Sequence, residues 1–319
     1  MILLHLSHFA TWCKTLNVPI THVNAVLLKD IRKHKCFKSV FPSDVRTLLG
    51  TPRSTPLKIV YDSCLKCSIH GKYVKNRVCF PGISAHLKTA TDFQNNDNIL
   101  QFVPYLDLVS DVVLDYMHVI CLGVTKKLLN LWTSGNSYYK LGQESKRKIS
   151  DRLENLINIC ISIEFPRKPR SLQDLKYYKA TEFRQLLLCT GPIAFQGFFD
   201  NDIYLNFLIL HVSIRILCME DASEEMINYA DELLKNFNKT FTILYGEENV
   251  SFNVHALLHL ANDVHKHGPL DYFSVFRFEN FLQKIKNLIR KPQDTLSQLH
   301  RRYIEMHNWI DVSKQYVKK

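Results

Sequence analysis

Two pairs of residues, far apart in the sequence, have the types and spacing of zinc ligands. Cys64 and Cys67 form a Cys-x-x-Cys pair, and His255 and His259 are four residues apart, which places both on one face of a helix. Two thiolates and two imidazoles suit Zn²⁺. The combination predicts a structural zinc site that joins two distant parts of the chain. Each pair alone is ambiguous, because Cys-x-x-Cys can be redox-active or accidental and histidines reach this spacing by chance.

Asp115 and His118 form a second polar pair, three residues apart on one face of an expected helix. Three interpretations remain open for this pair. His118 is a rival metal ligand, Asp115 and His118 can orient a ligand by hydrogen bonding to it, or the two residues bond to each other against the core.

Glu279 is the candidate catalytic acid, but it stands without evident partners. Metal-dependent phosphodiester chemistry typically uses several carboxylates around two divalent ions, so Mg²⁺ is expected only if the protein is catalytically active. We therefore interpret Glu279 as a vestigial catalytic residue. The simpler alternative is that Glu279 lies on the surface of a helix near Arg277 and Lys284. The sequence has no GxxxxGK[ST], GxGxxG or GxSxG motif, so ATPase, dinucleotide-binding and α/β-hydrolase functions have no support.

The chain is basic, with a formal net charge of +11 over 319 residues. Such a charge favours an acidic partner, most commonly nucleic acid, although a solvated basic surface is the alternative. Residues 1–56 carry eight Lys or Arg and two Asp. The candidate phosphate-contacting residues are Arg32, Lys33, Arg167, Lys168, Arg170, Lys176 and Lys179.

The cysteines and the N-terminus indicate an intracellular protein. The nine cysteines are odd in number and mostly far apart, which argues against a disulfide scaffold. The first residues lack the charged start and long apolar run of a signal peptide. Residues 203–219 are the most apolar stretch, but they are few for a membrane span and include Arg215. We expect a nuclear or cytoplasmic protein that is neither secreted nor membrane-bound.

Three segments are expected to position these residues. Residues 1–56 form a basic helical module, residues 57–105 a knuckle and loop region with short strands near 73–80, and residues 106–319 a series of helices. Helices are expected over 107–132 with an interruption near Gly123, over 144–161, over 182–188 with an end near Gly191 and Pro192, over 203–219 and over 224–244 after a Ser223 cap. A further helix capped by Asn253 carries the histidines to Gly268, Ser274 starts the Glu279 helix, and Asp294 caps a last one.

Several of these segments together resemble CACTA (En/Spm-like) DNA transposases. Residues 112–129 resemble the Asp-x-x-His segment of that family. Other parts of the chain also resemble the family: residues 167–172 together with 179–188, residues 253–260 (Asn-Val-His-Ala-Leu-Leu-His-Leu) and residues 276–280 (Phe-Arg-Phe-Glu-Asn). Residues 22–28 and 46–53 are similar to its N-terminal region. The resemblance covers nearly the whole chain.

The resemblance implies an RNase H-like core with two catalytic Asp, one Glu and a helical insertion, similar in plan to the catalytic subunit of the V(D)J recombinase. There, a Cys-x-x-Cys and a downstream His pair share one zinc ion just ahead of the catalytic Glu. By that likeness Cys64, Cys67, His255 and His259 hold zinc, and Glu279, 20 residues past His259, is the third acid.

The chain departs from the family where the other two acids belong. The family carries its two Asp in Asp-Gly and Cys-Asp-x-Pro-Ala contexts, and this sequence contains neither an Asp-Gly nor an Asp-x-Pro-Ala. We therefore expect a mainly α fold with a small zinc knuckle and an incomplete sheet, in a degenerate or domesticated transposase fragment that binds DNA, or other transposase chains, without cleaving DNA. The alternatives are a nuclease completed in trans or by Asp62, Asp107 or Asp111, and a helical protein-interaction scaffold.

Overall fold

The computed structural model describes residues 64, 66–89, 92, 109–135, 138–156, 167–276, 286–291, 293–295, 297–302 and 304–305. The described residues up to Val275 belong to one compact unit and those from Phe276 onward to a second, which is helical over 297–302. The predictions for Glu279, Arg32, Lys33, Asp62 and Asp107 lie outside the described residues. The division at residues 56 and 105 stays a prediction.

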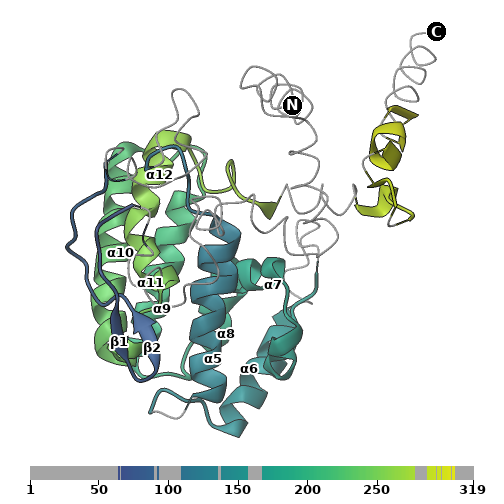
Figure 1. Ribbon diagram of the computed structural model, residues 1–319. Coiled ribbons are helices and arrows are strands. Elements are labelled where there is room, and N and C mark those ends of the chain that lie inside the picture. The colour runs from purple at the N-terminus through teal and green to yellow at the C-terminus, as the bar shows by residue number, and fades with distance from the viewer. Residues whose placement is uncertain are drawn as a thin grey trace. The chain divides into compact units, whose positions relative to one another are not determined.

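The first unit is mainly helical, as predicted, with one small antiparallel sheet in its described part (Figure 1). Short π-helical or 3₁₀-helical turns are labelled η and continue or connect the α-helices. The elements are β1 (Lys72–Val74), β2 (Arg77–Cys79), η4 (Met117–Thr125), α5 (Lys126–Ser134), α6 (Gln143–Asn155), η6 (Leu172–Tyr177), α7 (Ala180–Gln185), η7 (Leu186–Thr190), α8 (Gly191–Phe195), α9 (Asn201–Leu217), α10 (Glu224–Tyr245), η8 (Glu247–Asn249), α11 (Phe252–Ala256), η9 (Leu257–His259) and α12 (Leu260–His267).

The hairpin after the cysteines confirms the short strands predicted there. Strands β1 and β2 pair with Tyr73 opposite Val78, and Lys75 and Asn76 form the turn with φ of 46° and 61°. Two consecutive positive φ angles are typical of the tight turn whose twist matches that of the paired strands. The backbone N–H of Phe80 donates to the carbonyl of Val250 at 2.8 Å, so the hairpin is tied to the segment between η8 and α11.

An aromatic cluster around Trp132 forms the centre of the helical core. Its ring lies 5.3 Å from that of Phe195, 4.6 Å from that of Phe199 and 5.8 Å from that of Phe207, and its indole N–H donates to the Tyr245 hydroxyl at 3.1 Å. The bond satisfies the one polar atom of a buried Trp. The cluster therefore joins α5, α8, α9 and the end of α10.

The apolar helix α9 is buried along one side against α10, and Leu205 on its outer side is 55% exposed. Among the described residues, none of the helices combines the length and apolar character that crossing a membrane would need. Ser223 caps α10 as predicted, accepting a bond from the N–H of Met226.

The expected helix end at Gly191 and Pro192 is wrong, because the chain stays helical through Phe195. Proline lacks the N–H that would bond to the carbonyl four residues earlier. Here that carbonyl, of Leu188, accepts instead from Arg215 at 3.2 Å, and the neighbouring Leu187 carbonyl accepts from His211 at 2.8 Å. Side chains from α9 thus satisfy the carbonyls that the proline leaves open, and the π-helical turn η7 continues directly into α8.

The interruption predicted near Gly123 and the cap predicted at Asn253 are also wrong, and the two errors have one cause. Gly123 lies inside the continuous helical run of η4 and α5, and Ser251 rather than Asn253 precedes α11. A Cβ on Gly123 would lie 2.5 Å from the side-chain nitrogen of Asn253. Gly123 is therefore needed for the close approach of α11 and not for a helix break.

Candidate metal centre

The structure brings Cys64, Cys67, His255 and His259 together in a buried group whose ligand atoms all lie within 4.8 Å of one another. Cys64 Sγ lies 3.4 Å from His259 Nε2, Cys67 Sγ lies 3.2 Å from His255 Nε2, and the two Nε2 atoms are 3.4 Å apart. A tetrahedral zinc ion with its usual bond lengths would separate sulfur from nitrogen by about 3.5 Å and two nitrogens by about 3.3 Å. The spacing of the four side chains fits such an ion.

Different elements carry the two halves of the group. Cys64 and Cys67 lie just before the hairpin, and Cys67 pairs with Leu87 in an isolated antiparallel bridge that closes the knuckle. His255 belongs to α11 and His259 ends the 3₁₀ turn η9, so the histidine-bearing segment is a short α-helix followed by a tighter turn. The pair still points to one side, as the spacing predicted.

A backbone hydrogen bond fixes which nitrogen of His255 faces the group. His255 Nδ1 lies 3.1 Å from the carbonyl oxygen of Gly82, to which it donates. The proton on Nδ1 leaves Nε2 with a lone pair for a metal, the arrangement that metal-binding histidines commonly show. The ring of Phe80 lies 6.2 Å from that of His255 and covers it. The segment that follows the knuckle therefore orients one of its ligands.

The two thiols have opposite pKa shifts because they share a hydrogen bond. The bond from Cys67, together with bonds to His255 and His259, lowers the pKa of Cys64 to about 2 against the opposing effect of burial. The same bond, with burial, raises the pKa of Cys67. The lowered pKa favours the thiolate form of Cys64, which suits a metal cation. A metal ion would displace the proton from Cys67. Metal binding should therefore release protons.

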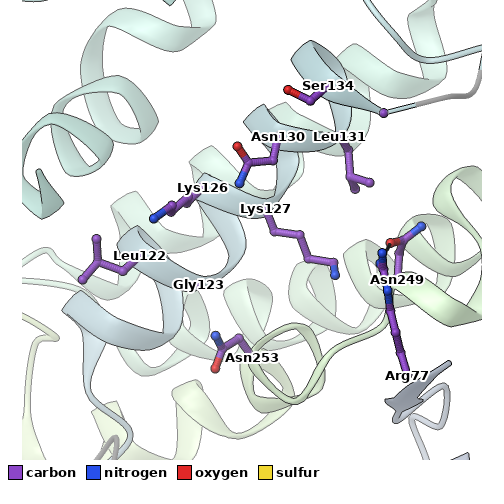
Figure 2. A pocket seen from close by; sticks show the side chains of 11 residues that line it. Arg77, Leu122, Gly123, Lys126, Lys127, Asn130, Leu131, Ser134, Asn249 and Asn253 are labelled. Atoms are coloured by element: carbon purple, nitrogen blue, oxygen red, sulfur yellow. Dashed lines mark hydrogen bonds between the residues drawn. The ribbon is translucent and has the colours of Figure 1, made fainter. Parts of the chain in front are cut away.

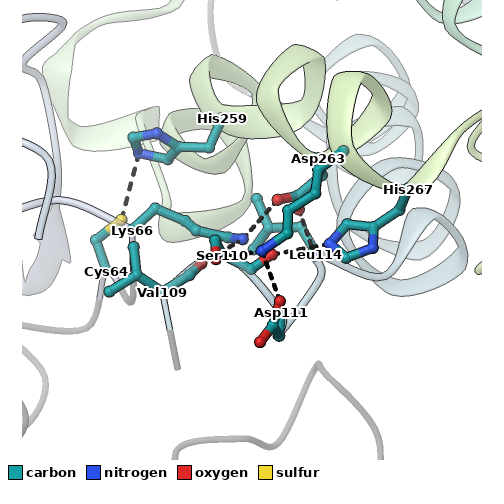
Figure 3. Close-up of polar contacts among 10 residues, drawn as sticks. Cys64, Lys66, Val109, Ser110, Asp111, Leu114, His259, Asp263 and His267 are labelled. Carbon is teal, nitrogen blue, oxygen red and sulfur yellow. Dashed lines mark hydrogen bonds and ion pairs between the residues drawn. The ribbon is translucent and has the colours of Figure 1, made fainter. Parts of the chain in front are cut away.

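A buried ion pair lies beside the group (Figure 3). Lys66, between the two cysteines, places Nζ 2.5 Å from Asp263 Oδ1 and donates to the carbonyl of Val109 at 2.8 Å, and the N–H of Leu114 donates to Asp263 Oδ2 at 2.7 Å. The side chains of Lys66 and Asp263 are only 6% and 3% exposed. The knuckle, α12 and the chain entering η4 are therefore held together by charged hydrogen bonds.

Two further residues of α12 hold the same entering segment. Lys266 donates to the side chains of Ser110 and Asp111 at 2.5 and 2.6 Å. His267 bonds to the Ser110 carbonyl at 2.8 Å (Figure 3). Asp111, which the sequence offered as a substitute catalytic acid, is thus engaged by a lysine.

Asp115 and His118 form their own pair outside the four-residue group. His118 Nδ1 lies 2.5 Å from Asp115 Oδ2, and the fully buried Asp115 also accepts from the backbone N–H groups of His118 at 2.9 Å and Val275 at 3.0 Å. Asp115 also accepts from the N–H of Met117, and the helix expected from residue 107 begins at Met117. Asp115 therefore caps that start and holds the chain that leads to residue 276.

Five of the predicted phosphate-contacting residues form a basic strip that is only partly available to a ligand: Arg167, Lys168, Arg170, Lys176 and Lys179. Four of its cations are exposed: Arg167, Lys168, Lys176 and Lys179. Arg170 is held by an ion pair within the protein. Its guanidinium bonds to both carboxylate oxygens of Glu182 at 2.6 and 3.0 Å, and its Cζ lies 5.3 Å from the centre of the Tyr178 ring. Glu182 lies 12 residues further on, so sequence spacing did not reveal the pair.

Lys66 and Asp263 are the residues of this site that sequence reasoning missed. A lysine between two cysteines looks like an exposed residue, and Asp263 lies on a short amphipathic helix where an exposed acid is expected. The one available signal was the helical spacing of His255, His259 and Asp263, which places Asp263 on the face of the ligands.

Comparison of the chain with protein-family models, with curated proteins and with solved structures gives no match. The likeness to CACTA transposases therefore rests on the motifs given above and stays a prediction.

Proposed function

We propose that the protein is a zinc-stabilised, DNA-binding remnant of a CACTA-like transposase that does not cleave DNA. The observation that carries the metal part is the buried Cys₂His₂ group with tetrahedral spacing. Four protein ligands complete the coordination of zinc and leave no position for water or substrate, which is the property of a structural site. Zinc bound there would join the knuckle to α11 and η9 and supply folding energy rather than chemistry.

The exposed part of the basic strip supports the DNA-binding half of the proposal. Lys176 Nζ lies 4.6 Å from the centre of the Tyr177 ring, and that ring is 57% exposed. An aromatic face beside cations suits a sugar-phosphate backbone or an unstacked base. Asp174 is the acid within η6, so the strip keeps a net positive charge.

Replacing Arg167, Lys168, Lys176 and Lys179 by alanine is expected to abolish most duplex binding. Each lost phosphate contact should make the negative slope of log K against log salt concentration less steep by about 0.9. Fluorescence anisotropy of a labelled duplex at several salt concentrations measures this slope. Loss of binding without a change of slope, or no binding by the natural protein at low salt, would contradict the proposal and favour a protein-interaction scaffold.

Two controls separate the strip from net charge and from stability. Alanine at Arg147, Lys148, Lys235 and Lys239 removes the same charge from cations that lie near carboxylates on α6 and α10, and should leave DNA binding nearly intact. Arg170→Met should keep DNA binding but lower stability by about 1–3 kcal/mol, because it leaves the Glu182 carboxylate, 3% exposed, without its cation.

We expect no DNA nicking or strand transfer by the purified protein with Mg²⁺ or Mn²⁺. The physical reason is that a single Glu cannot hold two catalytic ions, and Asp111 already pairs with Lys266 at 2.6 Å. A supercoiled-plasmid nicking assay measures the activity. Cleavage that disappears in Glu279→Gln while DNA binding is kept would establish the nuclease alternative, and the Glu279→Asn variant checks that the loss is not specific to one substitution.

A further inference from the structure

A cavity of about 500 Å³ lies between α5, the β1–β2 hairpin and the segment around η8 and α11 (Figure 2). Its size is that of a small-molecule site. Three cations line it: Arg77 from the hairpin, and Lys126 and Lys127 from α5. None of the lining residues that the structure describes is Asp or Glu.

Arg77 and Lys127 line the cavity, and neither makes an ion pair within the part of the chain that the structure describes. Lys126 makes none among the described residues either, and Figure 2 shows Lys127 extending toward Arg77. Burial, and then the charge of Arg77, lower the pKa of Lys127. Glu248 lies near Arg77 but pairs with Lys75 at 2.6 Å. Two cations that repel each other across a cavity are stabilised by an anion between them.

Neutral groups complete the wall. Asn249 accepts from Arg77 at 3.3 Å and donates to the Tyr245 carbonyl at 2.7 Å, so it holds the guanidinium in place while leaving other N–H groups of Arg77 available. Asn253 brings a side-chain amide to the rim because Gly123 leaves room for it. Leu122 and Leu131 add apolar surface.

We infer that this cavity binds a nucleoside phosphate, with the phosphate between Arg77 and Lys127 and the base or sugar against the leucines. Arginine and lysine with amide donors, and no acid among the described lining residues, form the chemistry that recognises a phosphate monoester. The nucleotide is either free or the end of a nucleic-acid strand. The site is separate from the strip at Arg167, Lys168, Lys176 and Lys179 and does not depend on that strip binding DNA.

Isothermal titration calorimetry with AMP, adenosine and a 5′-phosphorylated DNA tetranucleotide tests the inference on the full chain. AMP should bind and adenosine should not, at matched concentration. Lys127→Met and Arg77→Met should each weaken AMP binding by about tenfold or more, since each removes a charged hydrogen bond. Lys148→Met, an exposed lysine on α6 beside Glu144, is the matched control and should leave it unchanged. Circular dichroism verifies that each variant is folded.

The outcomes of the titration either assign the ligand of the cavity or overturn the inference. In the alanine variant of the exposed strip, tighter binding of the tetranucleotide than of AMP assigns the site to a strand end, and the reverse assigns it to a free nucleotide. Equal binding of adenosine and AMP, no binding of any phosphate at millimolar concentration, or binding that survives both Lys127→Met and Arg77→Met would overturn the inference. Because the alanine variant of the exposed strip keeps this cavity, it should bind AMP normally even where duplex binding is lost.

Discussion

Cys64→Ser is expected to remove stoichiometric zinc and with it most of the stability that the metal supplies. The side chain is 1% exposed and its sulfur lies 3.4 Å from His259 Nε2. A hydroxyl is a poor replacement for a thiolate, so the ion would lose one of four ligands in a buried site. At free zinc a thousand times above its dissociation constant, the metal stabilises the native state by about 4 kcal/mol, and most of this should be lost.

The measurement combines metal analysis with urea denaturation in the presence and absence of a chelator. In the natural protein, EDTA should lower the unfolding midpoint, and in Cys64→Ser it should change little. Cys189→Ser is the matched control, because it makes the same chemical change outside the Cys₂His₂ group and should retain one zinc per chain. A natural protein without stoichiometric zinc, or a Cys64→Ser variant that keeps it, would refute the zinc assignment.

Lys66→Met is expected to cost about 3–5 kcal/mol, because it leaves the carboxylate of Asp263 buried without its cation. Lys66 Nζ lies 2.5 Å from Asp263 Oδ1, and both side chains are almost completely buried. Asp263→Leu should have a similar effect, because it leaves the ammonium of Lys66 buried without a carboxylate and removes the acceptor for the Leu114 N–H. The double variant should cost less than the sum, because neither charge is then left alone.

Urea denaturation of the four proteins of this cycle gives the coupling energy, and metal analysis of each shows whether zinc is lost as well. The exposed pair Lys75 and Glu248, at 2.6 Å, is the comparison, and Lys75→Met should cost less than about 1 kcal/mol. If Lys66→Met cost no more than Lys75→Met while zinc was retained, the buried pair would not stabilise this junction.

The helical class and most element positions followed from local patterns. Apolar residues at helical spacing located α6, α9 and α10, and the Ser223 cap was correct because an N-cap bond depends on residues only three apart. The errors at Gly191, Gly123 and Asn253 came from reading glycine, proline and asparagine as local signals. In each case the deciding contact comes from a helix distant in sequence, such as Arg215 on the Leu188 carbonyl.

By itself the sequence determined the ligand types, because Cys-x-x-Cys and a histidine pair at i, i+4 each fix local geometry, and it determined the basic charge of the chain. Only the tertiary structure decided that the two halves meet, since 188 residues separate Cys67 from His255 and no local rule sets that distance. It likewise decided which cations remain available: Arg170 is held by Glu182, Lys66 is buried on Asp263, and Arg77 and Lys127 face one cavity. The physical reason is that residue types alone determine which side chains carry charge, whereas the burial and pairing of those charges depend on how the chain packs.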